Sequence, residues 1–103
     1  MIIINSLKED LERINKNIEM YESKIAKCSQ GYLREKKING KSYYYLRKRR
    51  GDKVEDKYVK KNEVQDVKES IKKRRFIEEN KKSLEEQKIF IEKVLKKELK
   101  DKV

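Results

Sequence analysis

The chain has 103 residues, with 30 Lys and Arg against 19 Asp and Glu, and carries a formal net charge of +11. It contains no His and a single Cys. Zinc sites, Ser-His or Cys-His nucleophilic centres and disulfides need residues that this composition lacks, so we expect no enzyme, no metal site and no cofactor. With 48% charged and 35% hydrophobic residues, the chain can bury only thin apolar stripes, and we expect a single domain over residues 1–103.

The first helix is predicted over residues 6–29. Its apolar residues recur at alternating steps of four and three, which is the seam of a coiled-coil helix. They are Leu7, Leu11, Ile14, Ile18, Tyr21, Ile25 and Cys28. Ser6 and Glu9 match the capping box, in which both side chains satisfy backbone N–H groups at a helix start. Gly31 fits a cap at the other end. The seam favours packing within the chain, and sharing it with another chain stays open.

Residues 31–61 contain all three glycines and are enriched in Tyr and Val, which indicates strands and turns. Asn39-Gly40 is a strong hairpin signal, because a type I′ turn needs a positive φ at both central residues. Gly51-Asp52 is a second, weaker turn. The predicted antiparallel strands cover residues 32–38, 42–50 and 53–60.

A second helix is predicted over residues 63–101, which hold no Gly or Pro and are rich in Lys, Glu, Leu and Ile. The fold class is therefore α+β, with two long antiparallel helices, residues 6–29 and 63–101, joined by a three-stranded antiparallel sheet over residues 32–60.

The unequal lengths of the helices predict an overhang. Pairing Cys28 with Gln65 brings Ser6 near Gln87, so residues 2–4 are placed to cover residues 89–91. The part of the second helix beyond that point is then a surface through which a homodimer would form.

The two turns set which side chains share a face of the sheet, because cross-strand partners point the same way. With Ile38 opposite Lys41, one face collects an apolar set that we expect to pack on the helices, namely Leu33, Tyr44, Leu46 and Val59. The other face alternates Tyr with Arg and Lys, and Asp56, opposite Arg47, is its only carboxylate. We expect this second face to meet solvent or a partner.

The strand region carries most of the excess charge, because residues 31–61 hold 12 basic and 4 acidic residues. Nucleic-acid binding uses cations that neutralise phosphates and aromatic rings that stack on bases. The sequence therefore predicts contact with nucleic acid or a nucleoprotein through the sheet face and a basic cluster on the second helix. The candidate binding residues are Arg34, Lys36, Tyr43, Tyr45, Arg47, Arg49, Tyr58, Lys72, Lys73, Arg74 and Arg75.

The stretch from Gly31 to Val59, GYLREKKINGKSYYYLRKRRGDKVEDKYV, resembles small proteins of low-GC Gram-positive bacteria and their phages. Those proteins place a hairpin of the form NGK-x-YYYL…GDKV…KYV between two Lys/Glu-rich helices. The sheet-then-helix portion is similar in topology to the arm-type DNA-binding domains of phage integrases and to plant AP2 domains. That similarity implies a sheet lying in the major groove, with Arg34, Tyr45, Arg47 and Arg49 as base and phosphate contacts.

Two other functions stay open. A phage or mobile-element origin also fits an inhibitor of a host defence complex, of the anti-CRISPR type, which would act by contact with a protein effector. The third function is a structural coiled-coil module that dimerises through the overhang.

The longest apolar run, residues 1–4, is far shorter than the roughly 18 residues of a membrane span, and it lacks the basic stretch of a signal peptide. We therefore expect no membrane contact and a place in the cytoplasm of a bacterial host cell.

Overall fold

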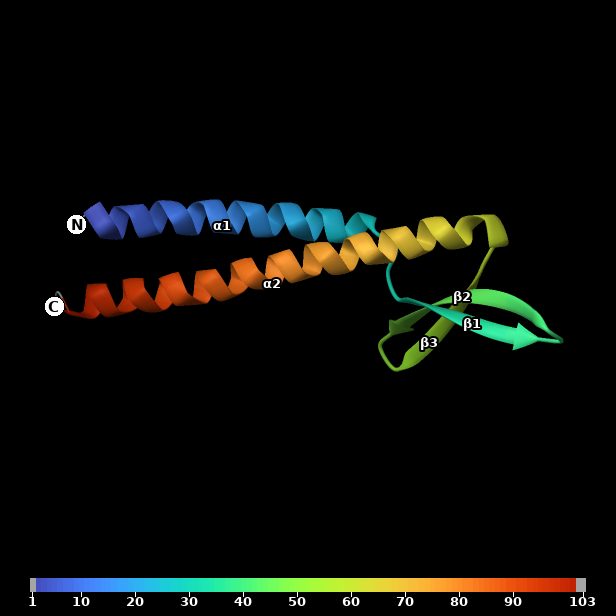
Figure 1. Cartoon of the computed structure of the whole chain (residues 1–103). Coiled ribbons are helices and arrows are strands. Elements are labelled where there is room, and N and C mark those ends of the chain that lie inside the picture. Colours follow the sequence, from blue (N-terminus) through green and yellow to red (C-terminus); the bar gives the residue numbers. More distant parts are fainter. Residues whose placement is uncertain (1, 102–103) are drawn as a thin grey trace. The chain divides into compact units, whose positions relative to one another are not determined.

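The computed structural model describes residues 2–101, with side chains described from Ile4 to Lys100 (Figure 1). The elements follow the predicted α+β order, which is confirmed. They are α1 (Ile2–Lys27), β1 (Tyr32–Ile38), β2 (Lys41–Arg50), β3 (Lys53–Val59), a short 3-10 turn (Lys61–Glu63) and α2 (Val64–Asp101).

The contacts within the chain group into two compact units. One unit joins the residues up to 25 with those from 77 onward, and the other comprises residues 26–76. In residues 2–101 we find no helix with an apolar stretch that would reach across a bilayer.

The first unit is a helical hairpin in which α1 lies antiparallel to the C-terminal part of α2 (Figure 1). Its buried centre consists of Ile14, Ile18, Ile91 and Leu95, and around it pack Ile4, Leu7, Leu11 and Leu84. Burying one such side chain contributes about 1.5–3 kcal/mol relative to leaving it in water. The alternating seam predicted for the first helix is therefore the face that packs.

The predicted start of α1 at Ser6 is wrong. The helix begins at Ile2, so Ser6 is an exposed residue inside the helix and does not cap it. Ile4 stands three residues before Leu7 and packs against the same buried cluster, so the apolar seam itself extends the helix backwards. The C-terminal cap predicted at Gly31 is also wrong, because α1 already ends at Lys27.

The predicted pairing of the two helices is wrong as well. Lys81 Nζ lies 3.3 Å from Glu22 Oε1, whereas the predicted register would place Glu22 beside Ile71. Ile71 packs instead in the other unit, together with Val64. The C-terminal part of α2 is thus paired with α1, and the overhang that suggested a dimer is absent from the described residues.

The expected cover over residues 89–91 fails for the same reason. Ile89 and Phe90 are exposed, and only Ile91 is buried. Of the three residues expected to cover them, the side chains of Ile2 and Ile3 lie outside the described part of the chain, and Ile4 packs against the cluster that contains Ile91.

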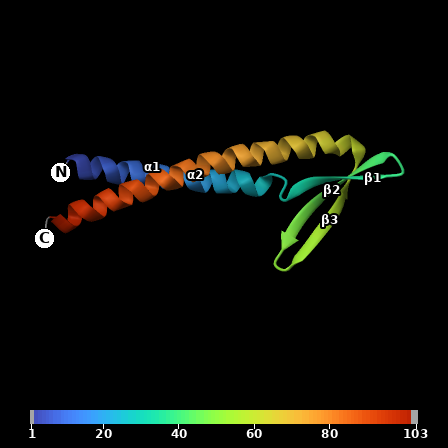
Figure 2. The ribbon, with the colours of Figure 1, turned by 60° about the horizontal axis from the view of Figure 1, so that its bottom comes forward.

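The second unit contains the sheet, whose strand order is β1-β2-β3 with antiparallel pairing throughout (Figure 2). Ile38 pairs with Lys41 and Arg50 pairs with Lys53, so both predicted two-residue turns and both registers are confirmed. Asn39 has φ 52° and Gly40 has φ 78°, as a type I′ turn requires.

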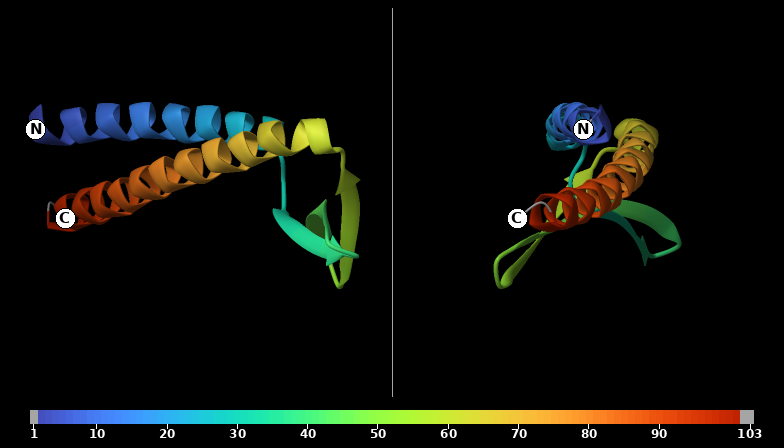
Figure 3. Two further views of the ribbon diagram at one scale, coloured as in Figure 1. Left: turned by 45° about the vertical axis from the view of Figure 1, so that its right-hand side comes forward. Right: turned by 90° about the vertical axis from the view of Figure 1, so that its left-hand side faces the viewer.

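The sheet lies beside the first turns of α2 (Figure 3). Its apolar face packs on them, as predicted. Leu46 and Val59 are buried against Val64 and Ile71 of α2. The half-buried residues around them are Leu33, Tyr44 and Val67. Because side chains alternate across a strand, this packing leaves the opposite face of the sheet uncovered by α2.

The segment between α1 and β1 is held to α2 by hydrogen bonds. The Arg74 guanidinium donates to the carbonyl oxygens of Ser29, at 2.5 Å, and Gly31, at 3.0 Å. The Ser29 N–H donates to Ser70 Oγ at 2.8 Å. Gly31 has φ 84°, and a Cβ placed there would overlap the carbonyl oxygen of Arg47. The entry into β1 therefore depends on a residue without a side chain.

Candidate nucleic-acid interface

The sheet face that points away from α2 carries alternating tyrosines and cations, and we call it the Tyr/Arg face. Pairing places on it Tyr32, Arg34, Lys36, Ile38, Lys41, Tyr43, Tyr45, Arg47, Arg49, Val54, Asp56 and Tyr58. All seven residues predicted in the strand region lie on this one face. Lys41 was missed by the sequence reasoning, although its pairing with Ile38 already implied that it shares the face.

Contacts between rings and cations organise the middle of the Tyr/Arg face. The rings of Tyr45 and Tyr58 meet edge to face, with centroids 5.8 Å apart and planes at 68°. Lys36 Nζ lies 4.9 Å from the centroid of the Tyr45 ring. Tyr58 remains 52% exposed. The face therefore offers an aromatic surface with a cation directly beside it, an arrangement suited to bases and phosphates.

Arg47 and Asp56 form a two-pronged ion pair across β2 and β3. Arg47 Nε donates to Asp56 Oδ1 at 2.7 Å, and the Nη2 atom donates to Oδ2 at 2.9 Å. The hydrogen bond with Arg47 holds the pKa of Asp56 below its usual value. The same bond raises the pKa of Arg47 against the lowering effect of burial, and a hydrogen bond that Arg47 donates to the Tyr32 hydroxyl adds a smaller contribution. The charge of Arg47 is thus largely matched inside the protein.

Arg34 and Arg49 are the other two arginines of the Tyr/Arg face. Arg34 is half-buried beside Tyr45, its pairing partner, and Arg49 is exposed opposite Val54. In the described part of the chain neither lies within ion-pair distance of a carboxylate. Their charges are therefore available to an anionic partner.

The lowered pKa of Asp56 predicts that the sheet unit is sensitive to acid. The ordinary pKa is 3.8, and the native value lies below it. The stabilisation from the ion pair is therefore complete above about pH 4 and is lost as the pH falls through the native pKa. We expect wild type and Asp56→Asn to differ in free energy of unfolding at pH 6, and this difference to shrink as the pH falls below about 4 and through the native pKa of Asp56. Urea unfolding, monitored by circular dichroism, measures this difference in free energy of unfolding. A difference that stays constant with pH would contradict stabilisation by the ion pair of Arg47 and Asp56.

The structure separates the four basic residues predicted as one cluster on the second helix. Lys72 and Arg75 line a groove beside the sheet. The Arg74 guanidinium is engaged by the carbonyl groups of Ser29 and Gly31. Lys73 is exposed and does not line the groove. Only two of the four therefore face a common space.

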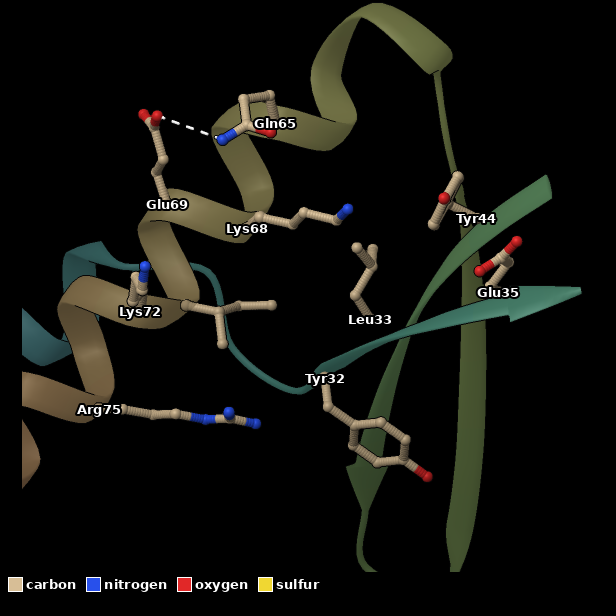
Figure 4. Close-up of a pocket in the computed structure, with 10 residues that line it drawn as sticks. Tyr32, Leu33, Glu35, Tyr44, Gln65, Lys68, Glu69, Lys72 and Arg75 are labelled. Atoms are coloured by element: carbon tan, nitrogen blue, oxygen red, sulfur yellow. Dashed lines mark hydrogen bonds between the residues drawn. The ribbon is translucent and has the colours of Figure 1, made fainter. Parts of the chain in front are cut away.

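That groove has a volume of about 790 Å³ and lies between α2 and the strands β1 and β2 (Figure 4). Its lining consists of Tyr32, Leu33, Glu35, Tyr44, Gln65, Lys68, Glu69, Ile71, Lys72 and Arg75. Lys68 extends toward the sheet, and its Nζ lies 5.3 Å from the centroid of the Tyr44 ring. The sequence reasoning missed Lys68, although its spacing of four from Lys72 and seven from Arg75 places all three on one side of a helix.

Within the described residues we find no group of three His, Cys, Asp or Glu side chains that could hold a metal ion.

Comparison with known families places the chain in one of them. The model described as Domain of unknown function (DUF6788) matches residues 3–69, which is more than half of the chain. The matched region spans α1, the whole sheet and the first turns of α2. It includes the Tyr/Arg face and ends before Lys72. No curated protein and no solved structure matches the chain.

Proposed function

We propose that this chain, which belongs to the family described as Domain of unknown function (DUF6788), is a binding protein that contacts nucleic acid or a nucleoprotein through its Tyr/Arg face. One observation carries the proposal. The face opposite the packed side of the sheet holds five cations and one carboxylate, and that carboxylate is already bound by Arg47.

The chemistry of this face suits a polyanion. Lys and Arg that neutralise phosphates release condensed counterions, which supplies most of the non-specific affinity for nucleic acid. The exposed Tyr58 ring, which meets the half-buried Tyr45 ring edge to face, adds aromatic surface beside those cations. A β-ribbon is narrow enough to enter a major groove, as other strand-based readers do. The hairpin resemblance supports a phage or mobile-element setting in the bacterial cytoplasm.

Fluorescence anisotropy with labelled random-sequence DNA and RNA, single- and double-stranded, tests the proposal. We expect micromolar binding at about 150 mM salt. The affinity for duplex should fall by about 0.9 log units per log unit of salt for each phosphate contacted, hence by up to about 3.6 for the four cations of the face that Asp56 does not bind.

Absence of binding even at 50 mM salt would contradict the proposal. The alternative function, inhibition of a host defence complex, would then be favoured, because its partner is an acidic protein surface rather than free nucleic acid.

A further inference from the structure

We infer that the groove between α2 and the sheet receives a nucleotide of a single-stranded nucleic acid, whose chain continues from the Tyr/Arg face into the groove across Tyr32. This inference rests on the proposed function and deepens it, because it names single-stranded nucleic acid as the ligand of the combined surface.

Tyr32 connects the two surfaces. It is the first residue of β1 and pairs with Arg47, so it belongs to the Tyr/Arg face. It also lines the groove, where Arg75 extends from α2 toward it (Figure 4). Tyr32 is 48% exposed. A ring at this corner can stack with a base while the chain passes from one surface to the other.

The cations of the groove are available to a phosphate. In the described part of the chain, neither Lys72 nor Arg75 lies within ion-pair distance of a carboxylate. Both residues are exposed on α2. A phosphate placed between them would meet an ammonium and a guanidinium, and the guanidinium can bind two phosphate oxygens at once.

Both carboxylates of the groove accept hydrogen bonds from neutral side chains and lie away from the gap between Arg75 and Tyr32. Glu35 accepts a hydrogen bond from Ser42 Oγ at 2.6 Å. Glu69 accepts one from Gln65 Nε2 at 3.4 Å, and both of these side chains lie on the margin of the groove away from the strands (Figure 4). Neither carboxylate stands between Arg75 and Tyr32.

The size of the groove decides between single and double strands. A volume of about 790 Å³ lies within the range of roughly 300–1,000 Å³ that holds small molecules, so the groove has room for one or two nucleotides. The stacked bases of a duplex are not free to enter such a space, whereas the bases of a single strand can turn out of the stack.

Anisotropy titrations compare wild type with Lys72→Ala/Arg75→Ala on a 12-nucleotide single strand and on a duplex of the same sequence. Each phosphate of a single strand that is no longer neutralised lowers the salt slope by about 0.7, so the double variant should lose about 1.4 in slope and about 15-fold in affinity at 150 mM salt. Its affinity for the duplex should change by less than about threefold. Lys82→Ala/Lys93→Ala removes the same charge from exposed positions of α2 outside the groove and serves as the control.

The possible outcomes separate the two proposals. Single-strand affinity equal to that of wild type, or an equal decrease in the control variant, overturns the groove inference and leaves the Tyr/Arg face standing. A decrease in the groove variant, when changes on the Tyr/Arg face have no effect, overturns the proposed function and the path of the strand across Tyr32, and leaves the groove alone as a nucleotide site. If wild type binds no nucleic acid at 50 mM salt, both fail. Circular dichroism of each variant verifies that it is folded.

Discussion

Replacing Gly31 by Ala is expected to lower the free energy of unfolding of the sheet unit by about 3 kcal/mol. A residue with a side chain pays about 1–2 kcal/mol for the left-handed conformation that Gly31 adopts at φ 84°. The added Cβ also overlaps the carbonyl oxygen of Arg47 and stands 3.0 Å from Lys48 Cγ. The carbonyl oxygen belongs to the backbone and cannot rotate away from the new Cβ as a side chain would. Relieving the overlap therefore costs about 1–3 kcal/mol more. Thermal unfolding by circular dichroism should show a midpoint at least about 10 °C lower.

Gly40→Ala is the matched control for this prediction. Gly40 also has a positive φ, of 78°, but a Cβ at this position meets nothing within 4 Å. Only the conformational cost of about 1–2 kcal/mol remains. Equal losses of stability in the two variants would show that the close approach of Gly31 to β2 is not important for stability.

Arg34→Ala/Arg49→Ala is expected to weaken binding to duplex nucleic acid by about 30-fold at 150 mM salt. Each arginine that neutralises a duplex phosphate supplies about 0.9 of the salt slope, so removing both lowers the slope by about 1.8, which at this salt concentration amounts to roughly 1.5 log units of affinity. These two arginines are preferred to Arg47, because removal of Arg47 would leave Asp56 without its partner and would mix an effect on stability with an effect on affinity. Anisotropy as a function of salt gives both the slope and the affinity.

Lys37→Ala/Lys57→Ala is the control for charge alone. Both lysines are exposed, and their pairing partners, Ser42 and Leu46, place them on the opposite face of the sheet. Their removal lowers the net charge by the same amount but should change the affinity by less than about threefold. A decrease as large as that in the arginine variant would mean that the overall charge, and not the Tyr/Arg face, binds the nucleic acid.

The sheet could be predicted from sequence because short-range rules determine it. A two-residue turn at Asn39-Gly40 fixes Ile38 against Lys41, and a second at Gly51-Asp52 fixes Arg50 against Lys53. Every further pair and both faces follow from these two pairings. The candidate residues of the strands could therefore be assigned to one face of the sheet from the sequence alone.

The arrangement of the helices could not be predicted in the same way, because the apolar residues of α2 serve two different partners. Val64 and Ile71 pack on the sheet, whereas Ile91 and Leu95 pack on α1. If all four residues are assumed to form one apolar stripe against α1, the predicted register of the two helices shifts. This shift produced the predicted overhang of α2, which the described residues do not have. The role of Gly31 was missed for a related reason, since its neighbour in space, Arg47, is distant in sequence.

The basic cluster on the second helix was misjudged although a sequence rule was available. Residues three or four apart share a side of a helix, and adjacent residues do not. Lys72 and Arg75 therefore face the groove together, while Arg74 is turned toward the carbonyl groups of Ser29 and Gly31. The run of four basic residues indicated a binding cluster. Only the helical periodicity separates Lys72 and Arg75, which are candidates for binding, from Arg74, which has a structural role.

The most direct test of the central claim follows the arginine Nε–Hε resonances by NMR while a 12-nucleotide strand is added. Arg49 and Arg50 are neighbours in β2 that lie on opposite faces of the sheet, and Arg50 is 3.5 Å from Glu55. We expect the signals of Arg34 and Arg49 to shift on binding and those of Arg50 and of Arg13 in α1 to stay in place. Shifts of Arg50 or Arg13 equal to those of Arg49 would contradict binding through the Tyr/Arg face.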